Sequence, residues 1–499
     1  MKTFNLDKAL LEFTGKWGST YWTIRNSFEG SQIFGGTGAG KTSGSGRIIG
    51  LKFLSNGYGG LVLTVKPDEK DQWIANCKAA GRSHDLIIVE PDGGNYFDFL
   101  EYESKDGGLT ENIVQVLKTV IRASKEKATG ANEDPFWESA LDMLIFSIID
   151  LCKLADGKVS IMRMYELVQT IPQNMSEYRD EEKKDKPDTA FMIALLKAKA
   201  KAKEQMDEWE ASLPVEKLRS FKDKSDYNEA LSLAVPDVRI YNMIYKFLET
   251  YMNLHEKTRS IIDFSFSGFL FSMLRDPIYS LFCRNASTFT PDDCLNGKII
   301  LLNLPVKLYH KAGRDTQIMF KYIWQRAMEK RQVNAQSRPV FLWADEAQNF
   351  IHEHDADFQA TARSSRIATV YITQNLPNYR ASMGGIHSND KVDAFLGTLC
   401  TKIIHANADT QTNKYLSELI GDVQYIETSR NTTMAGQYAM GKTQSLRIDR
   451  AVRPEEFVRL KTGGDLNKGK VEAYLHVQGN PIKDGLNYAK IMFDQNFNL

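Results

Sequence analysis

The chain has 499 residues, with 63 basic and 63 acidic side chains and therefore a formal net charge of zero. This balance excludes a general electrostatic attraction to nucleic acid or to an anionic membrane, so any basic surface must be local. Hydrophobic residues make up 42% and charged residues 25%, which is typical of a folded protein. The length is too great for one ordinary core, and we expect two or three domains.

The cysteines and the apolar runs indicate where in the cell the protein is located. The five cysteines form no CxxC pair, which indicates reduced thiols and disfavours a structural zinc site. No run of about 18 apolar residues occurs, and the N-terminus lacks the apolar core of a signal peptide. We expect a soluble, cytoplasmic protein that a partner could recruit to the inner membrane.

Between residues 30 and 100, short apolar runs alternate with helical stretches. The strand candidates are SQIF (31–34), GGLVLTVKP (59–67) and DLIIVEP (85–91), and they are separated by the helical stretches RIIGLKFLSNG (47–57) and DEKDQWIANCKAAGR (68–82). This alternation predicts a parallel, doubly wound sheet.

A glycine-rich stretch follows the first of these strands and fits the pattern G-x-x-x-x-G-K-[ST] in full. Glycines let backbone N–H groups wrap a phosphate, Lys41 reaches the β- and γ-phosphates, and the Thr42 hydroxyl is a ligand for Mg²⁺. The alternative is a flexible linker that matches by accident, but a linker would not lie between a strand and an apolar helix. The predicted nucleotide-binding residues are Gly35, Gly36, Thr37, Gly38, Ala39, Gly40, Lys41, Thr42 and Ser43.

The middle of the chain reads differently. From about residue 105 it is rich in Ala, Leu, Lys and Glu with apolar residues three and four apart, which predicts helices and no strands. The charge run YRDEEKKDKPD (178–188) is predicted to be a solvated loop. The simplest architecture is one α/β domain, in two parts at residues 1–104 and 286–499, interrupted by an all-α domain at residues 105–285.

Strand candidates return after this segment. They are KIILLNLP (298–305), PVFLWADEAQ (339–348), ATVYITQN (368–375) and TKIIHAN (401–407), with a helical stretch at 348–366. The polar segment 428–445 is expected to be a surface loop or a hairpin.

Two adjacent carboxylates end the strand at 340–344. Asp345 is placed to hold the Mg²⁺ shell, and Glu346 is placed to polarise the water that attacks the γ-phosphate. The alternative is an acidic residue that only caps a helix, which the full phosphate loop disfavours. Thr42 and Asp345 are therefore the predicted metal ligands, and Lys41 and Glu346 are predicted to be catalytic.

Three further residues complete the predicted catalytic set. Gln374 ends the neighbouring strand, where it could sense the γ-phosphate or orient water, although a surface glutamine is the plain alternative. Arg363 and Arg366 precede that strand, where a ring-shaped oligomer would present an arginine finger to the next subunit. Arg366 could equally be a solvated residue at a helix end.

With both motifs placed, the chain resembles the type IV secretion coupling proteins, the TraG/TraD-like conjugative DNA-transfer ATPases of the FtsK/HerA group of RecA-like motors. The resemblance covers most of the chain and includes GGTGAGKT, YFDFLEY (96–102), PFWESALDML (135–144), SFSGFLFSMLRDP (265–277), WADEAQNF and ARSSRIATVYITQN. It implies a RecA-like nucleotide-binding domain, ATP and Mg²⁺ as cofactors, a homohexameric ring with DNA in its channel, and Arg363 as the finger.

The sequence departs from the family pattern in three places. The family's frequent Arg-x-x-Gly reads Arg363-Ser364-Ser365-Arg366, so two arginines compete for one role. No transmembrane helix precedes the phosphate loop, and the family's Asp-Pro-Lys-Gly-Glu segment reads Val65-Lys66-Pro67-Asp68-Glu69. We expect an ATPase that moves single- or double-stranded DNA in conjugation or type IV secretion, together with secretion-channel, membrane-anchor or relaxosome proteins. The alternatives are a HerA/FtsK-like motor of an antiphage defence or DNA-processing system and an ATP-dependent receptor for protein cargo.

Overall fold

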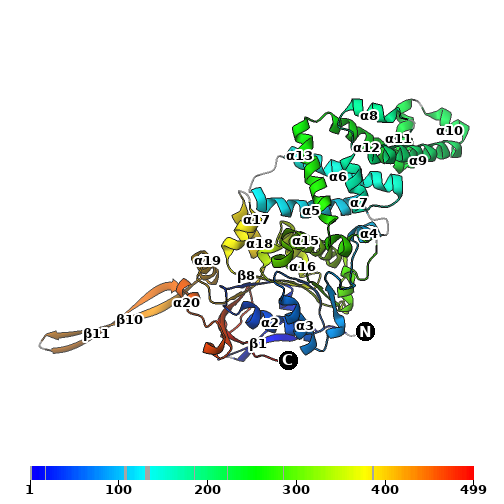
Figure 1. Cartoon of the computed structure of the whole chain (residues 1–499). Coiled ribbons are helices and arrows are strands. Elements are labelled where there is room, and N and C mark those ends of the chain that lie inside the picture. The colour runs from blue at the N-terminus through cyan, green and yellow to red at the C-terminus, as the bar shows by residue number, and fades with distance from the viewer. Residues whose placement is uncertain are drawn as a thin grey trace. The chain divides into compact units, whose positions relative to one another are not determined.

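The protein is described here from a computed structural model covering residues 3–16, 18–105, 109–129, 135–184, 186–221, 223–284, 286–384, 387–435 and 437–499. The chain divides into two compact units (Figure 1). The sheet unit comprises Met1–Ile88, Pro291–Gln317 and Trp324–Leu499, and the helical unit comprises Val89–Thr290 and Ile318–Ile323.

A nine-stranded sheet forms the centre of the sheet unit, in the order β13-β12-β9-β3-β8-β7-β4-β6-β5. Its strands are β3 (Ser31–Phe34), β4 (Gly59–Leu63), β5 (Leu86–Val89), β6 (Ile299–Leu302), β7 (Val340–Ala344), β8 (Ile367–Thr373), β9 (Thr401–Ile404), β12 (Lys470–Val477) and β13 (Tyr488–Asp494). The pairs from β9 through β3, β8, β7 and β4 to β6 are parallel, whereas β12 is antiparallel to β9 and β13. The predicted mostly parallel sheet is confirmed.

Helices cover both faces of the sheet. The central strands are therefore buried along their whole length, which agrees with their continuous apolar runs. On one face, Trp73 packs edge-on against Trp343 at 5.3 Å and Phe53 lies 5.7 Å from Phe341, measured between ring centroids. On the other face, Tyr371 meets Phe395 at 5.0 Å. The helices of this unit are α1 (Ile24–Ser27), α2 (Arg47–Ser55), α3 (Glu69–Ala79), α16 (His354–Ala362), α17 (Leu376–Met383), α18 (Ser388–Gly397), α19 (Thr410–Ile420) and α20 (Pro454–Val458). A further helix, α15 (Val306–Lys330), is shared, because its residues Ile318–Ile323 belong to the helical unit.

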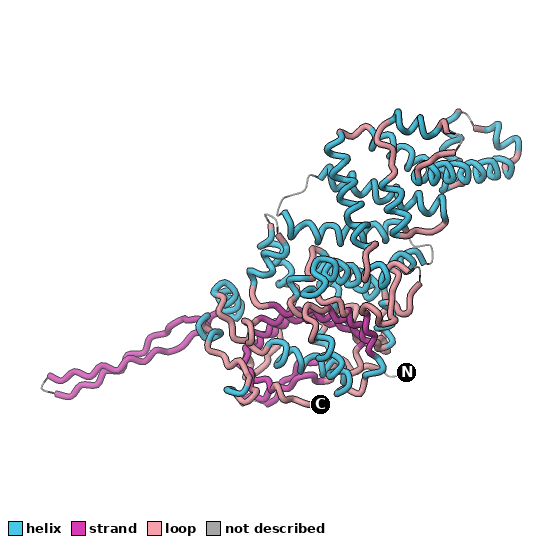
Figure 2. Tube along the Cα trace, in the orientation of Figure 1, coloured by secondary structure: helices cyan, strands magenta, loops and turns pink. Residues whose placement is uncertain are grey.

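Two antiparallel hairpins belong to the same unit. One joins β1 (Ala9–Gly15) to β2 (Gly18–Thr23). The other joins β10 (Asp422–Ala435) to β11 (Gln437–Arg450), and Figure 2 shows it as a long two-stranded ribbon. Of the two forms expected for the polar segment 428–445, the structure therefore shows the hairpin.

The helical unit is built from α-helices. They are α4 (Phe99–Ser104), α5 (Thr110–Thr129), α6 (Pro135–Asp156), α7 (Ile161–Gln169), α8 (Met175–Glu182), α9 (Ala190–Ser212), α10 (Val215–Ser220), α11 (Lys224–Ala234), α12 (Pro236–Met252), α13 (Glu256–Met273) and α14 (Ile278–Phe282). No helix in the described part of the chain is long and apolar enough to cross a membrane.

Two details of the helical unit differ from the expectations. The charge run 178–188 is not all loop, because the Asn174 side chain caps α8 by accepting the N–H of Glu177, and Tyr178 is buried. The unit also begins before residue 105. The Phe97 ring lies 5.1 Å from that of Phe320, which holds this segment in the core of the helical unit.

Candidate functional site

The phosphate loop lies at the carboxyl end of β3, between the strand and the π-helical turn η1 (Lys41–Gly46) that leads into α2. Gly38 and Gly40 have φ angles of +72° and +82°, which residues other than glycine rarely adopt. A Cβ atom on Gly40 would also lie 2.7 Å from a methyl group of Val471. The loop therefore requires glycine at position 40 for two separate reasons.

Lys41 is the first residue of the turn and its side chain lies back over the loop. The Nζ atom donates to the carbonyl oxygens of Gly35 at 2.7 Å and Gly36 at 3.0 Å. Burial lowers the pKa of Lys41, and the carboxylates of Glu346 and Asp345 oppose that effect. The ammonium group is thus held within the loop at the place where a phosphate would bring its charge.

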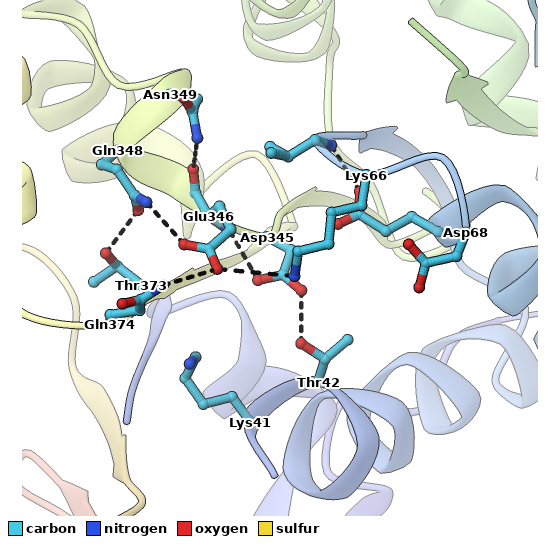
Figure 3. A network of polar contacts seen from close by, with 12 residues as sticks. Lys41, Thr42, Lys66, Asp68, Asp345, Glu346, Gln348, Asn349, Thr373 and Gln374 are labelled. Atoms are coloured by element: carbon cyan, nitrogen blue, oxygen red, sulfur yellow. Dashed lines mark hydrogen bonds and ion pairs between the residues drawn. The ribbon is translucent and has the colours of Figure 1, made fainter. Parts of the chain in front are cut away.

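Thr42 and Asp345 meet across the site, 303 residues apart in sequence (Figure 3). The Thr42 hydroxyl donates to Asp345 Oδ2 at 2.6 Å, and the N–H of Glu346 donates to Asp345 Oδ1 at 2.8 Å. Burial raises the pKa of Asp345. A hydroxyl and a carboxylate in contact are oxygen ligands of the kind that Mg²⁺ selects, so these two residues fit that ion.

Glu346 adopts a left-handed backbone conformation, with φ at +46°, and its carboxylate is held by two amides. Gln348 Nε2 donates to Oε2 at 2.8 Å and Gln374 Nε2 donates to Oε1 at 3.3 Å (Figure 3). Lys66 Nζ lies 3.9 Å from Oε1. The carboxylate is therefore oriented by two amide donors and also faces the ammonium group of Lys66.

Gln348 and Lys66 were not among the residues predicted for the site. Gln348 is itself positioned by Thr373, whose hydroxyl donates to Oε1 at 2.7 Å. Its position two residues after Glu346 was a signal that could have revealed it. Lys66 lies in the segment 65–69, which departs from the family pattern, so the comparison with the family did not predict a role for it in the site.

These groups line a cavity of about 470 Å³. Predicted residues on its wall are Thr37, Gly38, Ala39, Gly40, Lys41, Thr42, Ser43, Asp345, Glu346 and Gln374; other wall residues include Lys66, Glu69, Trp73 and Trp343. Gly35 and Gly36 begin the loop; their carbonyl oxygens accept from Lys41 Nζ, and the N–H of Gly36 donates to the Ala406 carbonyl oxygen at 2.7 Å. Ser43 Oγ accepts from Gln495 Nε2 at 2.7 Å.

Within one chain, the structure does not bring Arg363 and Arg366 to this cavity. Both precede β8, whereas Gln374 follows it, and seven residues at about 3.3 Å each span about 23 Å. The Arg363 side chain is 65% exposed, with its Nη1 3.6 Å from Glu29 Oε1. Arg366 has φ at +51° and donates to the carbonyl oxygens of Ala335 and Ser337, which ties it to its own chain.

A phosphate loop after β3 and an acidic residue buried at the end of β7, with β8 lying between these two strands of the parallel sheet, define a RecA-like P-loop domain. The sequence adds a family match: a family model described as the TraM recognition site of TraD and TraG matches residues 339–462. That range contains Asp345, Glu346 and Gln374. No curated protein matches the chain.

Solved structures resemble the chain over nearly its whole length. The bacterial conjugative coupling protein TrwBdeltaN70, in an unbound monoclinic form, has a TM-score of 0.62 at 13% identity, covering 98% of this chain and 89% of that one. The plasmid coupling protein TrwB in complex with ADP and Mg²⁺ has a TM-score of 0.60 at 13% identity, covering 96% and 88%. TrwB in complex with the non-hydrolysable ATP analogue ADPNP has a TM-score of 0.59 at 13% identity, covering 95% and 87%.

At these identities the structural likeness establishes the fold. Together with the family match, it confirms both the predicted fold class and the predicted resemblance to the conjugative coupling proteins.

Proposed function

We propose that the protein is a Mg²⁺-dependent ATPase of the coupling-protein kind. The observation that carries this proposal is the contact between Thr42 and Asp345, because it joins the phosphate loop to the acidic strand end at one point of one cavity. In this proposal the loop N–H groups and Lys41 bind the phosphates. Thr42 and Asp345 hold the ion, which supplies charge neutralisation at the β- and γ-phosphates when bound.

Hydrolysis in this proposal depends on Glu346. Its carboxylate accepts a hydrogen bond from the attacking water, which orients the water and increases its nucleophilicity. The amides of Gln348 and Gln374 fix the direction of that carboxylate. Gln374 also lies at the cavity wall, where the γ-phosphate is expected, so it couples the presence of that group to the orientation of Glu346.

We further propose that the protein forms a homohexameric ring and translocates DNA during conjugative transfer or type IV secretion. The coupling-protein fold over almost the whole chain supports this proposal, as does the exposed Arg363, which is available to a neighbouring subunit. The family match over residues 339–462 supports a contact with a relaxosome protein. A membrane-anchored channel protein is the further partner that this role requires.

ATP hydrolysis measured with and without single- and double-stranded DNA tests this function. We expect DNA to raise the rate, and Lys41→Ala and Glu346→Gln to abolish it. Lys78→Ala is the matched control, because Lys78 is an exposed lysine on α3 and should leave the rate unchanged. A rate indifferent to every DNA tested would contradict translocation, and retention of proteins by the helical unit would then favour the cargo receptor.

A further inference from the structure

Glu69, in the segment that departs from the family pattern, has one carboxylate oxygen with no hydrogen-bond partner among the described residues. It is the first residue of α3, and its side chain is buried, with 6% of the residue exposed. Oε2 accepts the N–H of Val65 at 2.7 Å. Oε1 is equally buried and has no hydrogen-bond partner in the described part of the chain.

Glu69 is one of the residues that line the nucleotide cavity, together with Thr42 and Asp345. Burial, and next the Asp345 carboxylate, raise the pKa of Glu69 to about 8. A buried acceptor without a donor is costly, and a second carboxyl group close by adds to that cost. Both costs fall when a cation and its water enter the cavity.

The neighbouring Asp68 makes a useful contrast. It is exposed, and its Oδ2 accepts from Gln72 Nε2 at 2.9 Å. Asp68 lines the same cavity, so it contributes a similar negative charge to the wall. Of these two carboxylates, Glu69 is the one that is buried and has an oxygen without a hydrogen-bond partner in the described residues. Comparing the two therefore distinguishes a specific contact from a general effect of negative charge.

We propose that Glu69 is a further positioning residue of the site, whose Oε1 accepts a hydrogen bond from a water of the divalent cation held by Thr42 and Asp345. This inference rests on the proposed function. Mg²⁺ usually keeps several of its waters in nucleotide sites, and those waters need acceptors. Residues that bind a metal through such contacts typically contribute a factor of about 10 to 100 in affinity.

Binding of Mn²⁺ to the full chain in the presence of ADP, followed by electron paramagnetic resonance of the free ion, tests the proposal without relying on catalysis. We expect Glu69→Gln to weaken Mn²⁺ binding by a factor of about 10 to 100. The affinity for ADP in EDTA should stay unchanged. Asp68→Asn, the matched control, should change Mn²⁺ binding by less than about threefold, because it removes charge but not the buried acceptor.

A second variant keeps the test decisive if Glu69→Gln fails to fold. Glu69→Asp keeps the charge but cannot both accept the Val65 N–H and reach the cavity, so it should also weaken Mn²⁺ binding several-fold. Unchanged Mn²⁺ affinity in either folded variant would overturn the role of Glu69 alone. A wild-type protein that binds no ADP would overturn the proposed function and this inference with it.

Discussion

At the scale of single residues, two glutamines orient the carboxylate of Glu346, and one of them was easier to predict from the sequence than the other. Gln374 ends the adjacent strand and could be expected from the strand pattern. Gln348 sits in a short turn after the strand, where its direction depends on the left-handed backbone of Glu346 and on the hydroxyl of Thr373. A sequence pattern reports strand ends well and turn geometry poorly, because the turn is decided by tertiary contacts.

Replacing Gln348 should therefore impair hydrolysis more than binding. We expect Gln348→Leu to lower kcat by about 10- to 100-fold, because Glu346 loses the donor 2.8 Å from Oε2, while ADP affinity stays unchanged. Gln72→Leu is the control, since Gln72 lines the cavity but donates to Asp68. Steady-state ATPase assays and calorimetric ADP titrations measure the two quantities, and equal losses in both variants would contradict the role of Gln348.

His405 introduces a pH dependence beside the phosphate loop. Its Nε2 lies 2.7 Å from Ser45 Oγ and its Nδ1 lies 3.2 Å from the Glu472 carbonyl oxygen. A carbonyl only accepts, so Nδ1 carries the hydrogen and Nε2 accepts from the serine. Burial lowers the pKa of His405 to about 3, and the neutral ring is the folded form.

Acidification should destabilise the protein through this histidine. Between pH 6.5 and pH 3 the unfolded state binds the proton and the folded state does not, so the contribution is complete above pH 6.5 and is lost as the pH falls. We expect His405→Asn to reduce the stability lost between pH 7 and pH 5 by about 2 kcal/mol. Urea unfolding at both pH values measures this, and an identical loss in the variant would contradict it.

At the scale of elements, the loop between β3 and α2 needs glycines for two reasons, and only one of them could be predicted from the sequence. The pattern of glycines predicted a phosphate loop, and the left-handed angles at Gly38 and Gly40 are what that loop requires. The contact of Gly40 with Val471 was not predictable, because β12 is more than 400 residues away and antiparallel to its neighbours.

Gly40→Ala should therefore distort the loop. We expect a loss of ADP affinity of at least about tenfold, because the left-handed angle alone costs roughly 1–2 kcal/mol with a side chain. Gly397→Ala at the end of α18 is the control, since its added Cβ would meet nothing within 4 Å and Gly397 does not line the cavity. ADP titration of both variants decides the matter, and equal affinities would show that the loop tolerates the change.

At the scale of the whole molecule, the chain has the phosphate-loop cavity at one end of β8 and the exposed Arg363 at the other end. Arg363 is separated from its own site by the length of β8, and Arg366 is tied to carbonyl groups of its own chain. The sequence left the two arginines in competition. Their environments favour Arg363 as the residue offered to a neighbour, and Arg366 as a residue that holds the turn before β8.

Mixing two inactive variants tests this division between subunits. Arg363→Ala should bind ATP but hydrolyse it about a thousandfold more slowly, and Lys41→Ala should be inactive in its own site. In a shared ring, a Lys41→Ala subunit can supply Arg363 to the intact site of its neighbour, so a mixture should regain activity. No recovery in a mixture that demonstrably co-assembles would contradict action in trans. Arg366→Ala should mainly lower the melting temperature.

The sequence by itself determined the class of the fold, the position of the phosphate loop and the position of the acidic strand end. Local patterns decide these features: apolar runs specify buried strands, the glycine-lysine motif specifies a phosphate loop, and helical spacing specifies the segment between. The tertiary structure alone decided which distant groups meet. The contact of Thr42 with Asp345 joins residues that are 303 apart and depends on the order of the strands. The amides on Glu346 and the buried Oε1 of Glu69 depend on the geometry of turns and strand ends, which tertiary packing sets.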